Sequence, residues 1–252
     1  MTNKLKYFVG NWKMFGDFTS FKIINKISNY FIRNLNTNNI KVILCVPNTL
    51  IYFFKQKMKS QTISLGAQNC HHYQDYGPFT GNVNAKMLKN SGANYIILGH
   101  SENRAIGESN KLIKVKIDSA LKSNLTVILC IGETLKEKRS KKTFRVLKKQ
   151  ITSCISKNQN LSKIIIAYEP VWSIGSNKIL KSEELKKIIH YIKFQYVKTF
   201  RTKKQPLVLY GGSVNEKNIK FFSPISEIDG FLIGGASQSA KKFIAIIKNY
   251  YK

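Results

Sequence analysis

Acidic residues are scarce in this chain, and several features that would assign it to other classes of protein are missing. Its 252 residues include 42 Lys or Arg but only 13 Asp or Glu, which gives a formal net charge of +29. The four cysteines form no CxxC pair, which argues against a disulfide framework and indicates free thiols in a reducing compartment. No apolar run is long enough to cross a membrane, and no secretory apolar region follows Met1. We therefore expect a cytoplasmic protein that spans no membrane.

Linkers, low-complexity tracts and short-period repeats are also missing. The hydrophobic content of 43% is enough for one large core, and α/β barrels reach this length as one domain. What recurs is a strand-like run followed by an amphipathic, Lys-rich stretch, which is typical of βα units. The sequence thus predicts a single catalytic domain over residues 1–252.

The excess of positive charge has two interpretations. A basic chain is typical of nucleic-acid binders, but these lysines are spread over nearly every expected helix, as in Lys148-Lys149 and Lys186-Lys187. No Arg-rich arm or aromatic RNP-type motif accompanies them. The chain is also rich in Asn and Ile, which like Lys have A/T-rich codons, and this favours compositional drift on solvated faces. We therefore expect no nucleic acid as the main partner, although the positive field can attract an anionic substrate.

Eight strand candidates alternate with helical patterns, and eight is the number that a closed (β/α)8 TIM barrel requires. The strands are expected at Tyr7–Asn11, Lys41–Val46, Ile63–Ala67, Tyr95–Leu98, Val127–Ile131, Lys163–Glu169, Leu207–Tyr210 and Gly230–Ile233. Helices are expected at Phe18–Phe31, Asn110–Leu121 and Lys241–Tyr250, and from Ser182 onward. The predicted fold class is α/β, a single TIM barrel.

The most informative segment is residues 163–178, with the sequence KIIIAYEPVWSIGSNK. Its β-branched run predicts a strand buried on both faces, and Glu169 stands at the end of that run, where barrels present catalytic groups. Pro170 restricts the backbone beside Glu169, whereas Gly175 gives the following loop freedom to move. A fixed base followed by a closable lid suits proton abstraction from carbon. The alternative is a strand-end Glu before an ordinary surface loop.

Further polar residues follow other expected strands. His100 precedes a helix, whose positive end favours a neutral imidazole that can polarise a substrate carbonyl; a structural helix cap is the alternative. Lys13 can offer charge to an anionic ligand, although most lysines in this chain are solvated surface residues. Gly211–Gly212 and Gly234–Gly235 expose backbone N–H groups to a phosphate, and two such loops in succession are a moderately specific signature.

A metal site is considered at His71 and His72, which lie beside Cys70. Adjacent histidines are expected to point in different directions, and no second ligand cluster stands at zinc spacing. We therefore expect no metal. Cys130 is expected to be a small buried residue.

Six motifs together resemble the triosephosphate isomerase family. They are NWKM at Asn11–Met14, GAQN at Gly66–Asn69, GHSENR at Gly99–Arg104, AYEPVWSIG at Ala167–Gly175, YGGSV at Tyr210–Val214 and FLIGGAS at Phe231–Ser237. The resemblance runs over almost the whole chain, with the motifs in family order and at family spacing. It implies interconversion of dihydroxyacetone phosphate and D-glyceraldehyde 3-phosphate through an enediolate, in glycolysis and gluconeogenesis, without any cofactor.

The resemblance also implies a role for each site residue. Glu169 resembles the catalytic base, and His100 resembles the neutral electrophile that stabilises the enediolate. Asn11 and Lys13 resemble the substrate-contacting pair. The residues that resemble the phosphate cradle are Gly175, Ser213, Gly234 and Gly235. Pro170-Val171-Trp172 resembles the first hinge of the lid.

Four positions depart from the family pattern. The family commonly has Gly where Asn177 stands in the lid, and Asn tolerates a left-handed backbone, so closure is expected to survive with altered kinetics. Phe15 stands where the family commonly has an Asn, and its ring can add apolar contact. Asn82 and Asn103 stand where the family commonly has an acid and an Arg, at its dimer contact. We expect a homodimer with a less ionic interface, an eroded interface being the alternative.

Two other functions are weighed against an isomerase. Another barrel enzyme acting on a different sugar phosphate is disfavoured by the EPVWSIG and GHSENR elements. A nucleic-acid or anionic-surface binder that exploits the positive charge is the third interpretation, and this property can coexist with catalysis.

Overall fold

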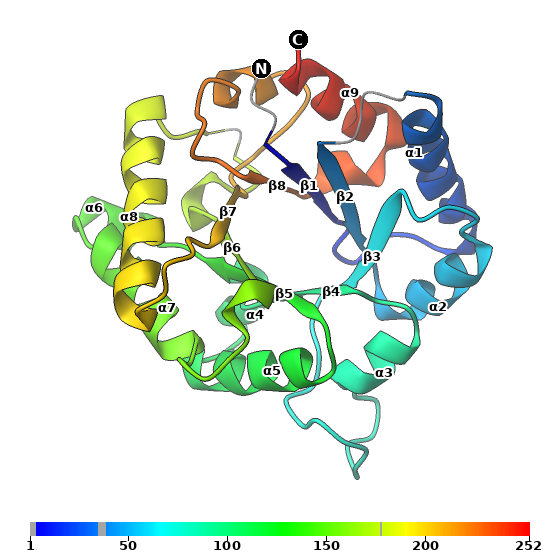
Figure 1. The fold of residues 1–252 in the computed structure, drawn as a ribbon, viewed down its shortest axis with the longest axis horizontal. Coiled ribbons are helices and arrows are strands. Elements are labelled where there is room, and N and C mark those ends of the chain that lie inside the picture. The colour runs from blue at the N-terminus through cyan, green and yellow to red at the C-terminus, as the bar shows by residue number, and fades with distance from the viewer. Residues whose placement is uncertain (1–3, 35–38, 177) are drawn as a thin grey trace.

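The computed structural model of the chain describes residues 4–34, 39–176 and 178–252. Within these residues, eight parallel strands form a closed barrel in chain order, with the helices on its outside (Figure 1). The strands are β1 (Lys6–Asn11), β2 (Ile40–Cys45), β3 (Ile63–Ala67), β4 (Tyr95–Leu98), β5 (Thr126–Ile131), β6 (Ile164–Tyr168), β7 (Leu207–Tyr210) and β8 (Gly230–Ile233). Pairing of β1 with β8, with Tyr7 opposite Gly230, closes the barrel. The predicted fold class is confirmed.

Helices follow most strands and cover the outside of the barrel. They are α1 (Phe21–Arg33), α2 (Asn48–Lys57), α3 (Ala85–Asn90), α4 (Ser101–Ala105), α5 (Asn110–Lys122), α6 (Leu135–Arg139), α7 (Thr143–Cys154), α8 (Ser182–Phe200) and α9 (Ala240–Tyr250). The expected helix from Phe18 starts as a 3-10 turn, η1 (Phe18–Ser20), because Asp17 caps that turn before α1 begins. Between β7 and β8, the described chain forms a 3-10 turn, η5 (Ile219–Phe222), in place of an α-helix.

Strand residues point alternately into the barrel and out toward the helices. In β5, Ile128 and Cys130 belong to the cluster inside the barrel, whereas Val127 and Leu129 pack in the outer cluster with the helices. All five residues of β6 are buried. This burial on both faces is why its sequence reads as a continuous apolar run.

All four cysteines are free and buried, as expected, and Cys130 is among them. Burial raises the pKa of each thiol, so the thiols stay protonated at neutral pH. Among the described helices, none is long and apolar enough to cross a bilayer.

The segment between β3 and α3 extends beyond the ring of helices (Figure 1). Here the rings of His71 and His72 stack with their centroids 4.3 Å apart, and His71 also packs on Phe79 at 4.4 Å. The expectation that the two histidines point in different directions is therefore wrong. It assumed the alternation of an extended strand, and this segment is irregular.

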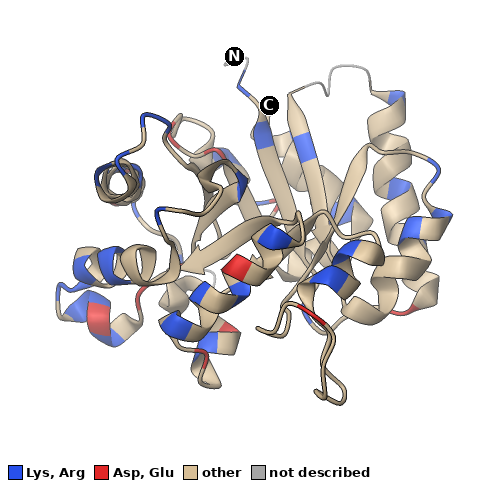
Figure 2. Cartoon of the chain, turned by 60° about the horizontal axis from the view of Figure 1, so that its bottom comes forward, with Lys and Arg blue, Asp and Glu red and all other residues tan. Residues whose placement is uncertain are grey.

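Lys and Arg residues lie on helices all around the barrel, with few acids between them (Figure 2). Most are exposed, but Lys6, Lys116 and Lys193 are buried. Lys116 pairs with Glu108, and Lys193 pairs with Asp229 at 2.7 Å. Burial lowers the pKa of Lys6 to about 8.

Candidate active site

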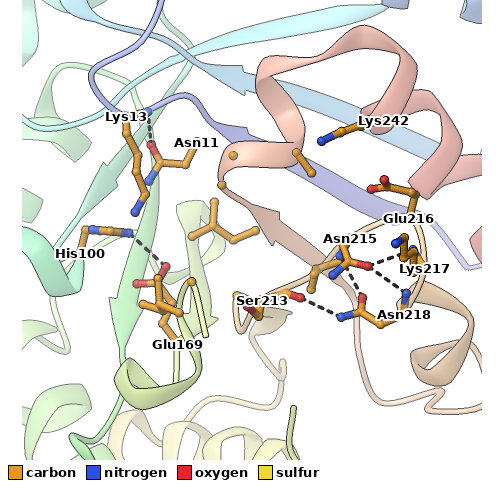
Figure 3. Close-up of a pocket in the computed structure, with 18 residues that line it drawn as sticks. Asn11, Lys13, His100, Glu169, Ser213, Asn215, Glu216, Lys217, Asn218 and Lys242 are labelled. Carbon is orange, nitrogen blue, oxygen red and sulfur yellow. Dashed lines mark hydrogen bonds and ion pairs between the residues drawn. The ribbon is translucent and has the colours of Figure 1, made fainter. Parts of the chain in front are cut away.

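The carboxyl ends of the strands open into a cavity of about 660 Å³ (Figure 3). All eight residues that the sequence assigns to the site line this cavity: Asn11, Lys13, His100, Glu169, Gly175, Ser213, Gly234 and Gly235. They come from the ends of β1, β4, β6, β7 and β8 and the loops that follow them. Closure of a parallel barrel brings these ends to one face, where barrel enzymes hold their active sites.

Lys13 is held in an unusual backbone conformation at the edge of the cavity. Its φ of 56° lies in the left-handed region that non-glycine residues seldom adopt, and its backbone N–H donates to Oδ1 of Asn11 at 3.1 Å. Its Nζ pairs with Oε1 of Glu102 at 2.5 Å. This strained turn directs a positive charge into the site, and such strain is typical of functional positions.

His100 and Glu169 point toward one another across the cavity (Figure 3). Nε2 of His100 lies 3.3 Å from Oε1 of Glu169, and both side chains are buried. His100 caps α4, and its Nδ1 accepts the backbone N–H of Glu102 at 3.2 Å. When the ring is neutral, this contact favours the tautomer that carries the ring N–H on Nε2.

The second carboxylate oxygen of Glu169 has no hydrogen-bond partner among the described residues. Oε2 is buried and accepts no hydrogen bond from any residue in the described part of the chain. A buried carboxylate oxygen without a donor has unmet hydrogen-bonding capacity, which a bound substrate can satisfy. An acceptor and an imidazole N–H thus converge on one small space.

The pKa of His100 is raised above its ordinary value. Burial acts in the opposite direction and is the largest single influence, but the carboxylates of Glu169 and Glu102 together outweigh both burial and the charge of Lys13. A helix N-terminus favours the neutral ring, but these carboxylates act against it. Moreover, α4 has only five residues, so its dipole is small.

Backbone contacts fix Glu169 from both neighbouring strands. Its N–H donates to the carbonyl of Ile131 at 2.8 Å, and the N–H of Gly211 donates to the carbonyl of Tyr168 at 2.9 Å. A Cβ at Gly132 would lie 1.7 Å from the carbonyl oxygen of Glu169, and a Cβ at Gly211 would lie 2.8 Å from its Cγ. Gly211, which the sequence links to phosphate, is therefore also required by the packing of Glu169.

The lid after Glu169 begins as a 3-10 turn, η4 (Val171–Ser173), that is attached to Glu133. Glu133 is fully buried, and its carboxylate accepts Nε1–H of Trp172 at 2.9 Å and the hydroxyl of Tyr168 at 3.2 Å. Burial raises the pKa of Glu133 despite these bonds. Nζ of Lys138 lies 3.9 Å from the centre of the Trp172 ring, a cation–π contact.

Sequence analysis missed Glu133 and several residues of the cavity wall. The one feature of the sequence that points to Glu133 is its position two residues after the end of the fifth expected strand. Gly175 has a φ of 68°, a left-handed conformation that glycine adopts without strain, whereas Asn177 lies outside the described residues.

Two asparagines that were not predicted from the sequence hold the turn that carries Ser213 at the cavity wall. Nδ2 of Asn218 donates to the carbonyl of Ser213 at 2.8 Å, and Oδ1 of Asn215 accepts the N–H groups of Lys217 and Asn218 at 2.9 and 3.1 Å. Ser213 has a φ of 47°, so this turn is strained like that of Lys13. The pair of asparagines three residues apart was the available signal, since Asn side chains commonly close such turns.

Gly234 and Gly235 lead into a 3-10 turn, η6 (Gly235–Gln238), at the end of β8. A Cβ at Gly235 would meet no atom within 4 Å, and a Cβ at Gly234 would come no closer than 3.7 Å to Cε of Lys13. Both backbones therefore face open space in the cavity, where an anion can approach their N–H groups.

Together the barrel and this site define an α/β-barrel protein whose cavity holds one buried carboxylate, one imidazole and glycine-lined open space. A sequence model of the triosephosphate isomerase family matches residues 6–250. Triosephosphate isomerase of Bartonella henselae is 35% identical over 248 residues, 98% of this chain and 97% of the relative. That of Yarrowia lipolytica is 38% identical over 250 residues, 96% of this chain and 98% of the relative.

A solved structure agrees with the sequence comparisons. The crystal structure of triosephosphate isomerase from Bartonella henselae superposes with a TM-score of 0.88 at 34% identity, covering 98% of this chain and 99% of that one. The chain belongs to the triosephosphate isomerase family. It is an isomerase, as the sequence resemblance implied.

Proposed function

We propose that this isomerase interconverts dihydroxyacetone phosphate and D-glyceraldehyde 3-phosphate with Glu169 as the base and His100 as the electrophile. Oε2 of Glu169 takes a proton from C1 of dihydroxyacetone phosphate, the C–H electron pair becomes the C1=C2 bond, and the π pair of the C2=O bond moves onto O2 to give the enediolate. The same carboxylic acid then returns its proton to C2. Nε2–H of His100 donates to the substrate oxygens and lets the hydroxyl proton pass from O1 to O2.

The 3.3 Å separation between Nε2 of His100 and Oε1 of Glu169 is the observation that carries this proposal. Two groups this close can contact adjacent carbons and oxygens of one three-carbon substrate. The bond from the backbone of Glu102 to Nδ1 supports the Nε2–H tautomer that a carbonyl requires. A substrate that enters between Glu169 and His100 separates the two side chains. The carboxylate of Glu169 then raises the pKa of His100 less.

The remaining predicted residues bind the substrate in this proposal. Lys13 supplies positive charge near the phosphate and the developing oxyanion, and Asn11 fixes the turn that carries it. The cradle of Gly175, Ser213, Gly234 and Gly235 offers backbone N–H groups to the phosphate. Lid closure then excludes water, which strengthens these interactions and suppresses loss of phosphate from the enediolate.

We also propose that the chain is one catalytic domain over residues 1–252 that works in the cytoplasm as a homodimer, in glycolysis and gluconeogenesis. Exposed apolar side chains support the dimer: Phe15 and Phe79 are each 37% exposed, and Met14 is fully exposed. Nδ2 of Asn82 donates to the carbonyls of Phe79 and Thr80 at 3.4 Å, within its own loop. This use of Asn82 is consistent with a less ionic interface, because the amide closes the loop that the family uses for dimer contact.

The direct test is Glu169→Asp, which retracts the carboxylate by one methylene. We expect kcat to fall by about 10²-fold in both directions of a steady-state assay, since misplacing a reacting group by about 1 Å has an effect of this size. The inhibition constant of 2-phosphoglycolate should change little. Glu216→Asp, at a carboxylate that lines the same cavity, is the matched control and should keep normal turnover. Full activity of Glu169→Asp would contradict the assignment of the base.

A further inference from the structure

Lys and Arg residues are dense in one surface segment, residues 136–149, called here the basic segment. Eight of its 14 residues are Lys or Arg and one, Glu137, is acidic, whereas Lys and Arg make up 42 of 252 residues in the whole chain. The segment covers most of α6 and the first half of α7. These helices lie on the left in Figure 1, and the ribbon there is largely blue in Figure 2.

Most of this charge has no acidic partner. The carboxylate of Glu137 is used in a capping box, where it accepts the backbone N–H of Thr134 at 2.8 Å. Lys138 pairs with Glu184 at 2.9 Å, and this is the only ion pair of the basic segment among the described residues. The seven other Lys and Arg side chains are exposed. The segment therefore presents cations to solvent that an external polyanion can neutralise.

An exposed aromatic ring stands among these cations. Phe144 is 44% exposed, and its ring packs on Tyr191 of α8 with centroids 4.5 Å apart, which holds it in place. Arg145 is its neighbour in sequence, and Lys148 lies one turn further along the same face of α7. A fixed aromatic ring beside cations is the arrangement that binds unstacked bases through the ring and their phosphates through the charges.

We propose that the basic segment, with the Phe144–Tyr191 ring pair, binds single-stranded nucleic acid as an activity separate from isomerisation. No residue of the segment lines the catalytic cavity. The phosphates of a duplex would contact the cations, but the bases of a duplex already stack on one another. No base would therefore be available to stack on Phe144. An anionic membrane requires a broad apolar face, and Leu135 and Phe144 are the only large exposed apolar side chains between residues 135 and 149, all of which are described.

The test measures fluorescence anisotropy of a labelled oligouridylate of about 12 nucleotides, a length within the range of single-strand sites. The full chain should bind it saturably at about 0.1 M salt, with a steep salt dependence. A combined Lys141→Gln, Arg145→Gln, Lys148→Gln and Lys149→Gln variant should bind at least tenfold more weakly. Its slope of log affinity against log salt should fall by about 0.7 for each phosphate contact removed.

A matched control removes the same charge elsewhere. It combines Lys22→Gln, Lys26→Gln, Lys203→Gln and Lys204→Gln, four exposed positions away from α6 and α7, and should change affinity less than twofold. Equal losses in the two combined variants would show only a generic polycation and overturn the proposal. Absence of saturable binding by the unmodified chain would do the same.

Substitutions of Phe144 test whether the partner is a single strand, a duplex or an anionic membrane. Phe144→Ala should weaken binding about tenfold with little change of the salt slope, because stacking is lost and charge is kept. Phe144→Leu keeps an apolar contact with Tyr191 and should lose affinity similarly. All variants should retain isomerase activity and thermal midpoint. Unchanged affinity of both Phe144 variants, equal affinity for a duplex of the same length, or equal competition by phosphatidylserine vesicles would each refute the single-strand assignment.

Discussion

At the scale of single residues, neighbouring charges decide the protonation of His100. Its raised pKa means that the ligand-free ring holds a proton at pH values where an ordinary histidine, with a pKa of about 6.5, has lost it. Neutral imidazole appears as the pH rises through the raised pKa. We therefore expect kcat/KM, which reports on the free enzyme, to rise across the same interval.

A substitution at Glu102 tests how neighbouring charges set the pKa of His100. Glu102→Gln removes one of the carboxylates that raise the pKa of His100 and also unpairs Lys13, whose charge lowers it. Both changes act in the same direction, so the pKa of His100 should fall and the acid limb of kcat/KM should move to lower pH. NMR titration of the His100 ring measures the first effect directly. Glu183→Gln, at an exposed carboxylate on α8, is the control, and an equal shift there would refute the assignment.

Packing against a single side chain also explains why residue 211 is a glycine. The Cβ of a Gly211→Ala variant would lie 2.8 Å from Cγ of Glu169, so the buried base must move. We expect kcat to fall by about 10²-fold, as for a reacting group displaced by about 1 Å. Circular dichroism and 2-phosphoglycolate binding show whether fold and phosphate site persist. Loss of inhibitor binding with unchanged kcat would instead assign Gly211 to the phosphate alone.

At the scale of elements, the lid is tied to the barrel through Glu133. Trp172→Phe removes the indole N–H that bonds this buried carboxylate, and Tyr168→Phe removes another donor from the same group on strand β6. Each variant should lower the free energy of unfolding by about 1–3 kcal/mol, the usual effect of leaving a buried acceptor short of a partner. Urea titration measures this loss.

Only the tryptophan belongs to the lid, so the two variants should differ in turnover. We expect Trp172→Phe to lower kcat severalfold because the lid closes less often, and Tyr168→Phe to leave kcat near normal. Equal turnover of the two variants would mean that the bond to Glu133 stabilises the barrel and does not guide the lid.

How far the sequence predicts these elements depends on the range of the interactions that form them. Strand β6 was predictable because a strand buried on both faces needs a continuous apolar run, and Glu169 because it follows that run directly. The bond from Trp172 to Glu133 spans 39 residues, and no local pattern signals it. The largest influence that raises the pKa of His100 is also non-local, since Glu169 approaches the ring from another strand.

At the scale of the whole molecule, the surface near Phe15 and the loop after β3 carries exposed apolar side chains that a partner copy can cover. Phe15 packs edge-on against Trp12 with centroids 5.8 Å apart and stays partly exposed, and the loop after β3 extends beyond the helices (Figure 1). Burial of such side chains is insensitive to screening, whereas exposed charge pairs weaken as salt shortens the Debye length. We therefore expect a dimer at micromolar concentration whose dissociation constant changes little from about 0.05 M to about 0.5 M salt.

Analytical ultracentrifugation of two variants separates this interface from general surface effects. Phe15→Asp places a charge in the proposed contact and should raise the dissociation constant by at least about tenfold, as loss of a buried aromatic anchor commonly does. Phe194→Asp, on the exposed face of α8, introduces the same charge at a side chain that is 51% exposed and should leave the dimer intact. A chain that is monomeric at micromolar concentration would reject the dimer. A dimer that high salt dissociates would show that ionic contacts at positions other than 82 and 103 hold it together.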